Sequence, residues 1–241
     1  MKESIWNGFK RIDFDFEGRE AVLVFPDQPD NGKWLYKTEY FGAFPAFELE
    51  MVRRGYHLAY LQNHSRWCRP EDIPVKARFC DYLRNTYGLQ KQCVMVGMSC
   101  GGMHAVYFAA AYPEYAAGLY LDAPVMNLLS CPCGVGDATD EMYAEFVQHT
   151  GITKSELINF RHHPIDAADA LVQHQIPVYL VCGDSDSTVP YHENGKQLAQ
   201  MYERAGAPIT VTVKPGCGHH PHGLDDVTPL VRFAEQRIRN K

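Results

Sequence analysis

The stretch from residue 92 to residue 113, QCVMVGMSCGGMHAVYFAAAYP, constrains the fold of this chain more than any other segment. It joins an apolar run, a glycine-serine turn and an alanine-rich segment without a gap. Residues 93–96 have the length and composition of a buried parallel strand, and residues 103–111 supply small side chains that let a helix pack close to a sheet. The stretch therefore predicts a strand, a sharp turn and a buried helix.

The turn has the sequence Gly97-Met98-Ser99-Cys100-Gly101, which matches the G-x-S-x-G pattern of a nucleophile elbow. Its two glycines leave room for a strained backbone that holds the serine oxygen above the end of the strand. A glycine-rich turn with an incidental serine would show the same letters, but the flanking strand and helix favour the functional interpretation. We therefore predict that Ser99 is a nucleophile.

Strand and helix patterns alternate along most of the chain. Residues 10–16 and 20–25 predict an antiparallel hairpin. Further strands are predicted at 34–37, 57–61, 93–96, 117–121, 177–182 and 209–213, and helices at 44–54, 75–87, 103–111, 192–205 and 225–239. This order predicts an α/β fold with a mainly parallel, twisted sheet, helices on both faces, and ligands at the carboxyl ends of the strands.

The alternation breaks between about residues 124 and 175. This segment contains a loop rich in Cys, Pro and Gly, helical stretches near 140–149 and 154–160, and a polar loop with His162 and His163, which we expect to be solvated. Inserted after a strand, it predicts a small helical cap that shapes access to a site. A length of 241 residues with 46% hydrophobic content is enough for one domain over residues 1–241 that includes this cap.

Two downstream loops contain the other groups that nucleophilic catalysis requires. After the strand at 177–182 the chain reads GDSDSTVP, and Asp186 is our predicted triad acid. Asp184 directly follows the glycine of the strand and is expected to brace the turn. Asp122, at the end of the preceding strand, is the alternative acid. After the final strand the chain reads PGCGHHPHG, where the general base belongs in the chain order Ser, Asp, His.

The same residues raise the question of a metal. His219, His220 and His222 cluster closely, but a zinc site generally has more ligands, and this spacing contains no helical i, i+4 pair, so we predict no metal. The eight cysteines are predicted to be reduced thiols, because several lie inside predicted strands. Cys131-Pro132-Cys133 matches neither the C-x-x-C redox spacing nor a zinc knuckle.

Charge and hydropathy exclude other classes of partner. The net charge is -6, the pI is near 6.0, and the basic residues are scattered, so no nucleic-acid partner is expected. The chain has no apolar run of the roughly eighteen residues that span a membrane. Its first ten residues lack the apolar core of a signal peptide. We expect no membrane partner and a cytoplasmic location.

The motifs GMSCG, GDSDSTVP and GCGHH, in this order at the ends of strands, resemble those of the α/β-hydrolase superfamily over essentially the whole chain. Their wording is most similar to that of uncharacterised bacterial esterase-type α/β-hydrolases, through the stretches 34–42, 121–124 (LDAP) and 219–222 (HHPH). That family usually has arginine after the nucleophile, where this chain has Cys100. Since the backbone NH at that position is the oxyanion donor, the departure concerns side-chain contacts to the substrate.

The resemblance implies acyl transfer through a covalent ester on Ser99. His219 would take and return the proton, and Asp186 would orient its imidazole. The backbone NH groups of Cys100 and Tyr40 would bind the oxyanion, with Glu39 as the alternative to Tyr40. No cofactor is required.

The expected protein is a serine hydrolase, most specifically a carboxylesterase that removes short acyl groups from a small-molecule ester such as an acetylated carbohydrate. The cap is short and polar and lacks the continuous apolar face of a lipase lid. Candidate substrate-binding residues near the predicted strand ends are Trp67, Tyr191, Glu193 and Asn194, which alternatively pack the rim. A peptidase or amidase with the same triad, or a catalytically silent binding protein of this fold, remains the alternative.

Overall fold

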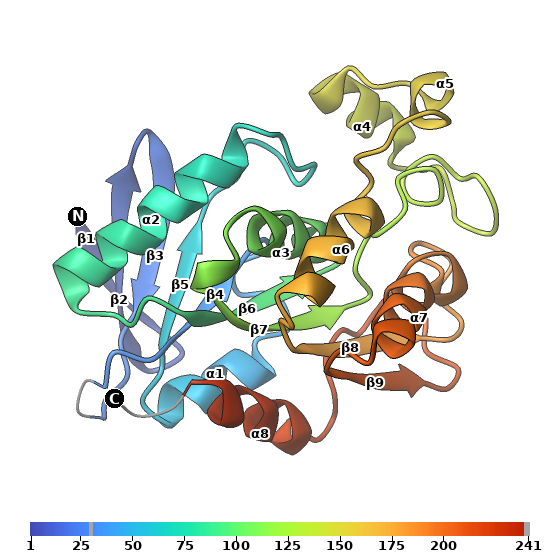
Figure 1. Cartoon of the computed structure of the whole chain (residues 1–241). Coiled ribbons are helices and arrows are strands. Elements are labelled where there is room, and N and C mark those ends of the chain that lie inside the picture. The colour runs from blue at the N-terminus through green and yellow to red at the C-terminus, as the bar shows by residue number, and fades with distance from the viewer. Residues whose placement is uncertain (29–30, 239–241) are drawn as a thin grey trace.

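The computed structural model describes residues 1–28 and 31–238. Within them, one sheet has the strand order β1-β2-β3-β5-β4-β6-β7-β8-β9, and helices cover both of its faces (Figure 1). The strands are β1 (Lys2–Trp6), β2 (Phe9–Phe16), β3 (Arg19–Val24), β4 (Trp34–Lys37), β5 (His57–Leu61), β6 (Cys93–Met98), β7 (Ala116–Asp122), β8 (Val178–Gly183) and β9 (Ile209–Lys214). The helices are α1 (Ala46–Arg53), α2 (Asp72–Tyr87), α3 (Cys100–Ala111), α4 (Tyr143–Thr150), α5 (Lys154–Leu157), α6 (Pro164–Gln173), α7 (Gly195–Ala205) and α8 (Thr228–Arg237), with short 3-10 turns at Pro113–Tyr115 and Tyr191–Glu193.

The sheet is antiparallel at its N-terminal edge and parallel over the rest of its width. β1, β2, β3 and β5 pair antiparallel in that order. The pairs from β5–β4 to β8–β9 are all parallel. Every residue of β4, β6 and β8 is buried, as expected for strands that are covered on both faces. The predicted fold class, a mainly parallel sheet with helices on both faces, is confirmed.

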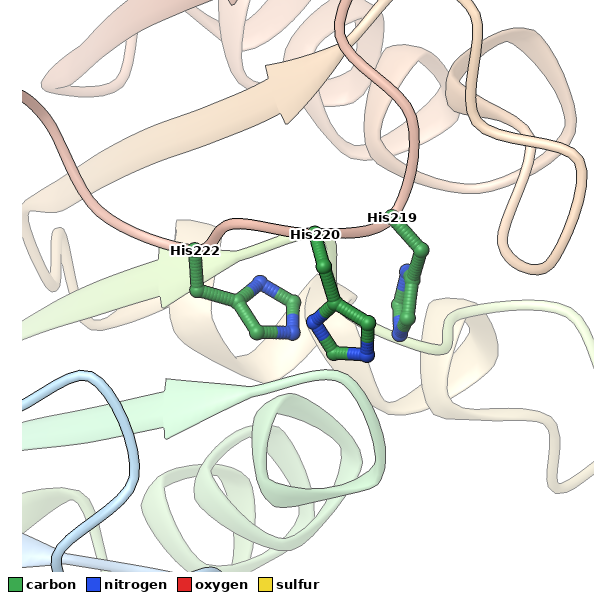
Figure 2. Close-up of side chains that lie close together, drawn as sticks. All are labelled: His219, His220 and His222. Atoms are coloured by element: carbon green, nitrogen blue, oxygen red, sulfur yellow. The ribbon is translucent and has the colours of Figure 1, made fainter.

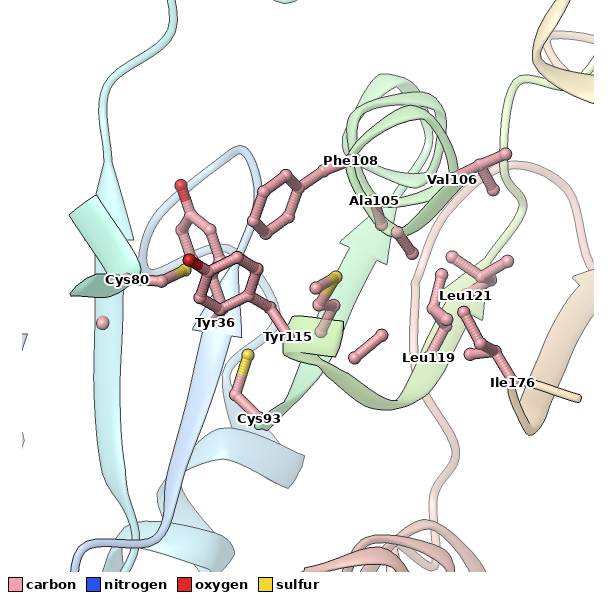
Figure 3. Packing of buried hydrophobic residues seen from close by; sticks show 14 of the residues in the cluster. Tyr36, Cys80, Cys93, Ala105, Val106, Phe108, Tyr115, Leu119, Leu121 and Ile176 are labelled. Atoms are coloured by element: carbon pink, nitrogen blue, oxygen red, sulfur yellow. The ribbon is translucent and has the colours of Figure 1, made fainter. Parts of the chain in front are cut away.

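Two apolar layers hold the helices on the sheet. One layer joins the sheet to α2, α3, α6 and α7, and the other joins it to α1 and α8. Figure 3 shows part of the first layer, where Phe108 of α3 meets Tyr36 of β4 edge to face with ring centroids 6.0 Å apart. Each large apolar side chain buried in this way contributes about 1.5–3 kcal/mol. This packing fixes the carboxyl ends of the parallel strands along one edge of the sheet.

The structure differs from the sequence-based expectation at a few elements. β1 is an additional edge strand that pairs with β2, and its polar residues hid it from pattern analysis. The predicted helix at 192–205 is a 3-10 turn followed by α7. The predicted end of the last helix at residue 239 lies outside the described residues. No helix in the described part of the chain has both the length and the apolarity to span a membrane.

The segment between β7 and β8 divides into two parts. α4 and α5 stand beyond the strand ends, whereas α6 packs with α3 and α7 against the sheet (Figure 1). His162 is exposed, as predicted. His163 is buried, and its Nδ1 accepts a hydrogen bond from the amide of Leu128 at 3.1 Å. The prediction that His163 is solvated is therefore wrong, because a buried loop amide needs its imidazole as an acceptor.

A buried ion pair connects the end of β4 to α1. Lys37 and Glu48 are each 1% exposed and form a salt bridge. The Lys37 ammonium also donates to the carbonyl of Ala43 at 3.3 Å and lies 3.2 Å from Sδ of Met98. Ala43 lies in the turn after β4, and Met98 directly precedes Ser99. The buried ion pair therefore contacts both the turn after β4, which contains Tyr40, and the turn that contains Ser99.

Replacing Glu48 by glutamine is expected to lower the free energy of unfolding by about 3–5 kcal/mol, because Lys37 would lose the counterion of a buried charge. Urea denaturation followed by circular dichroism measures this loss. Glu50→Gln is the matched control on the same helix, since Glu50 pairs with Arg54 at the surface and such pairs contribute about 0–1 kcal/mol. Equal losses in the two variants would contradict the prediction.

Candidate active site

Ser99 lies in a strained turn between β6 and α3. Its backbone has φ 52° and ψ -122°, a region that costs a non-glycine residue about 1–3 kcal/mol. A Cβ atom at Gly97 would lie 2.6 Å from the carbonyl oxygen of Gly101, so only glycine fits at the first position of the motif. Ser99 is 7% exposed. The turn therefore presents its hydroxyl at the carboxyl edge of the sheet, as the motif predicts.

His219 connects Ser99 to Asp186. Its Nε2 lies 3.1 Å from Oγ of Ser99, and its Nδ1 lies 2.7 Å from Oδ2 of Asp186. The Asp186 side chain is 1% exposed, and its Oδ1 accepts hydrogen bonds from the amides of Thr188 and Val189 at 2.8 Å each. These amides fix the orientation of the carboxylate. The structure thus brings the three sequence-predicted residues into one hydrogen-bonded chain.

The acid loop and the histidine loop meet at a glycine. A Cβ atom at Gly183 would lie 2.2 Å from the carbonyl oxygen of Cys217 and 2.7 Å from that of Gly218. Asp184 accepts a hydrogen bond from the amide of Gly216 at 2.7 Å, so it braces the turn as predicted. The sequence analysis did not single out Gly183, although a glycine between a buried strand and the acid loop was a signal that could have found it.

Asp122, the alternative acid, binds a different histidine. Its Oδ1 accepts a hydrogen bond from Nδ1 of His222 at 2.7 Å, and its Oδ2 accepts one from the amide of Gly223 at 2.7 Å. The main-chain carbonyl of Asp122 accepts the amide of Ser99 at 2.9 Å. Asp122 therefore links the turn of Ser99 to the histidine loop, and among the described residues the carboxylate hydrogen-bonded to His219 is that of Asp186.

The backbone amides predicted to bind an oxyanion belong to two turns that lie against each other. Cys100 is the first residue of α3, where an amide has no acceptor within the helix. Tyr40 follows β4 with φ 55°, and its hydroxyl contacts the thiol of Cys100. The hydroxyl of Thr38 donates to the carbonyl of Gly101 at 2.7 Å and ties the two turns together. The Cys100 amide directly follows Ser99 in the chain, whereas the Tyr40 amide interacts with the carboxylate of Glu39. The amide nitrogen of Glu39, the alternative donor, would lie 3.5 Å from a Cβ atom at Gly101.

Burial keeps the thiol beside Ser99 protonated. It raises the pKa of Cys100 to about 11, and the hydrogen bond from Tyr40 and the charge of Arg66 oppose this shift only in part. Burial also raises the pKa of the Tyr40 hydroxyl. Because the thiolate is the nucleophilic form of cysteine, Cys100 is unreactive at neutral pH. The hydroxyl of Ser99, in contrast, lies 3.1 Å from Nε2 of His219.

Two of the four predicted substrate-binding residues are fully buried. Trp67 is 0% exposed, and its indole donates to Oε1 of Glu145 at 3.1 Å. Asn194 is 1% exposed, and its Oδ1 accepts the amides of Met126 and Asn127 at 2.9 Å each. These contacts place both side chains in the packing between the cap segment and the sheet.

The other two, Glu193 and Tyr191, also make contacts within the protein. Glu193 accepts hydrogen bonds from the hydroxyl of Ser130 at 2.5 Å and from the amide of Asp137 at 2.7 Å. Tyr191 packs against the apolar layer of the sheet. Among the described contacts, neither residue is hydrogen-bonded to Ser99 or His219. The structure therefore does not bring Trp67, Tyr191, Glu193 and Asn194 together with the triad residues through hydrogen bonds.

The sequence analysis missed Phe44, which lies beside the histidine loop. Its ring stacks on that of His220 with centroids 5.4 Å apart and meets that of His222 edge-on at 5.3 Å. An apolar hollow of about 130 Å³ next to His222 is lined in part by Phe44, Phe47 and Tyr120. This is smaller than the roughly 300–1,000 Å³ of typical ligand pockets.

Comparison with known proteins agrees with this fold. Residues 77–240 match the prolyl oligopeptidase family. Similar solved structures include a putative dipeptidyl aminopeptidase IV from Bacteroides ovatus, with a TM-score of 0.70 and 16% identity over 98% of this chain and 36% of that one. An acylaminoacyl peptidase from Pyrococcus horikoshii has a TM-score of 0.69 and 11% identity over 88% of this chain and 38% of that one. A putative esterase from Staphylococcus aureus has a TM-score of 0.66 and 15% identity over 87% of this chain and 75% of that one.

These likenesses establish the fold. The chain spans 36% and 38% of the length of the two peptidases, and the identities are all below 25%, so the activities of those proteins do not transfer with the fold. The predicted α/β-hydrolase fold and superfamily are confirmed.

Proposed function

This chain belongs to the prolyl oligopeptidase family of α/β-hydrolases, and we propose that it is a carboxylesterase that cleaves short acyl esters with Ser99 as its nucleophile. The family match supports a serine hydrolase. The observation that supports the residue roles is the hydrogen-bonded chain from Ser99 through His219 to Asp186.

The acylation step follows from this geometry. As Oγ of Ser99 attacks the ester carbonyl, Nε2 of His219 takes its proton, and Asp186 stabilises the imidazolium through Nδ1. The amides of Cys100 and Tyr40 stabilise the negative oxygen of the tetrahedral intermediate. His219 then gives the proton to the leaving alkoxide, the carbonyl–oxygen bond breaks, and an acyl ester remains on Ser99.

Deacylation repeats the same steps with water. His219 takes a proton from the water as its oxygen attacks the acyl carbonyl, and it returns this proton to Oγ of Ser99 when the acid leaves. In both steps the proton that leaves the nucleophile, the Ser99 hydroxyl or water, passes through Nε2 of His219. No metal or organic cofactor takes part in this scheme.

The packing above the nucleophile turn supports a small acyl group. An apolar cluster joins the turn and the acid loop to the cap, and its fully packed members are Trp67, Cys100, Met103, Val125, Leu128, Cys131, Cys133, Phe146, Leu157 and Val189, none more than 4% exposed. A long acyl chain needs free apolar surface, whereas these side chains bury theirs against one another. In the described part of the cap, the large exposed hydrophobic residues are Val135 and Ile158, too few for a lipid-binding face.

A panel of p-nitrophenyl esters tests the acyl preference. We expect kcat/KM to be highest for acetyl or butyryl and to fall by at least about tenfold, or 1.4 kcal/mol, for octanoyl and palmitoyl. A preference for octanoyl or longer chains would contradict the proposal. Release of acetate from acetylated sugars, measured in parallel, tests whether the alcohol part of the substrate is a carbohydrate. Activity on simple esters without acetate release from sugars would contradict a carbohydrate substrate.

A peptidase is the second candidate, and the family match favours it. The same triad would then protonate an amine leaving group, a harder departure than that of an alkoxide. Acyl-aminoacyl and dipeptidyl p-nitroanilides, compared with the matching p-nitrophenyl esters, separate the two. If an anilide is cleaved as fast as its ester, the protein is a peptidase. If only esters are cleaved, it is an esterase.

A further inference from the structure

Three histidines of one loop converge beside Ser99. The rings of His219, His220 and His222 point to the same side of the loop and toward one another (Figure 2). Their centroids form a nearly equilateral triangle, with separations of 4.9, 4.8 and 4.9 Å. One ligating nitrogen from each ring lies within 4.8 Å of those of the other two. Three nitrogens bound to one Zn²⁺ at 2.0–2.1 Å are about 3.3 Å apart, so modest side-chain rotations close the gap.

Two of these imidazoles have buried carboxylates behind them. Nδ1 of His219 is 2.7 Å from Asp186, and Nδ1 of His222 is 2.7 Å from Asp122. The Asp122 and Asp186 side chains are 2% and 1% exposed. Carboxylate–histidine pairs of this kind orient metal-ligating imidazoles and raise their basicity. The hydrogen bonds leave Nε2 as the available nitrogen on each of the two rings.

The third histidine opens the cluster to solvent. His220 is exposed, so an ion can enter from its side, and Phe44 stacks on its ring. Lys214 holds the loop through the carbonyls of Pro221 and Gly223, at 2.6 and 3.1 Å. The ligands are therefore held close together before any ion arrives.

We propose that His219, His220 and His222 form a binding site for Zn²⁺, and that the bound ion reversibly blocks hydrolysis. Each neutral imidazole donates one lone pair to the cation, and water takes the fourth position, as in three-histidine zinc sites. The Nε2 lone pair of His219 is then unavailable to the proton of Ser99. The blocking part rests on the proposed function, whereas the binding part does not.

The spacing of the histidines alone argued against a metal, because the loop supplies three ligands and no helical pair. The fold adds the two carboxylates, which come from β7 and from the loop after β8. Other groups of potential ligands lack this support. Cys68, Asp72 and His104 lie beside the cation of Arg19, and Asp137, His192 and Glu193 form a largely exposed group.

Calorimetric titration of ZnCl₂ into the EDTA-treated and dialysed full chain tests the binding part. We expect one ion per chain at this site, and we expect His220→Gln to weaken Zn²⁺ binding by at least about tenfold. Losing a residue that only orients a ligand already weakens metal binding by about 10–100-fold, and His220 is itself a proposed ligand. His192→Gln is the matched control and should bind as the wild type does. Asp122→Asn should weaken binding by about 10–100-fold if the carboxylate orients His222.

Co²⁺ reports the coordination directly. Four-coordinate Co²⁺ absorbs visible light much more strongly than the hydrated ion, so the wild type and Ser99→Ala should both develop this absorption, and His220→Gln should lose it. The use of Ser99→Ala makes this measurement independent of activity. Equal Zn²⁺ affinity in the wild type and His220→Gln, or a loss in His192→Gln instead, would overturn the site.

Ester hydrolysis tests the blocking part. Zn²⁺ should inhibit the wild type, and EDTA should restore activity. His220→Gln, with each rate taken relative to its own metal-free rate, should need at least about tenfold more Zn²⁺ for the same inhibition. An active enzyme that binds Zn²⁺ through His220 without losing activity would overturn the blocking part. A chain that binds Zn²⁺ as expected but hydrolyses no ester or anilide would refute the proposed function and leave the metal site standing.

Discussion

Replacement of Ser99 by alanine is expected to lower kcat by about 10⁴- to 10⁶-fold, as the loss of a triad nucleophile does in serine hydrolases. This corresponds to about 5–8 kcal/mol of lost transition-state stabilisation. Hydrolysis of p-nitrophenyl acetate measures the rate, and labelling by a fluorophosphonate should vanish with it. The fold should be kept, because alanine retains the Cβ atom and leaves the turn around φ 52° unchanged.

Ser155→Ala is the matched control for this variant. Ser155 is an exposed serine of α5, so the same chemical change there should leave rate and labelling unchanged. If Ser99→Ala kept more than about a tenth of the wild-type rate, the loss would be under 1.4 kcal/mol, and Ser99 would not be the nucleophile.

Replacement of His219 by alanine should damage catalysis as severely as the loss of Ser99. Without Nε2 at 3.1 Å from the Ser99 hydroxyl, nothing removes its proton as it attacks. The double variant Ser99→Ala/His219→Ala should be scarcely worse than either single variant, because the two residues act as one unit. Single-turnover rates with p-nitrophenyl acetate measure all three.

Two other histidines serve as comparisons. His174→Ala changes an exposed residue at the end of α6 and should have no effect on the rate. His222→Gln removes the ring bound to Asp122 and should cost less than His219→Ala. Greater damage at His220 or His222 than at His219 would move the base to that position.

The sequence predicted the strand-end residues of the site because each sits in a motif with its own backbone requirement. Gly97 marks a position where a Cβ atom does not fit, and a Cβ atom at Gly101 would be tight against Glu39, so the two glycines of the motif located Ser99. The buried strands before the acid and histidine loops placed Asp186 and His219 at the same edge of the sheet. Parallel strands with regular crossovers bring their carboxyl ends together, so the order of the motifs was enough to predict that these three residues meet.

The sequence did not predict which way the neighbouring side chains face. Trp67 and Asn194 follow predicted strands, but their polar atoms hydrogen-bond within the protein and their side chains are buried. His163 reads as a residue of a polar loop but accepts a buried amide. A residue type and a position at a strand end do not contain this information, because it depends on which unsatisfied groups the packing brings within reach.

By itself, the sequence determined the order in which the candidate catalytic groups follow the strands: a serine after one strand, a carboxylate after another and a histidine loop after the last. Only the tertiary structure decided which carboxylate serves which histidine, since Asp122 and Asp186 both follow buried strands. Asp186 meets His219 because Gly183 lets the two loops approach to backbone contact, and Asp122 meets His222 on the adjacent side. Chain order limits a carboxylate to one edge of the sheet, whereas distances of about 2.7–3.1 Å between loops depend on the packing of the whole fold.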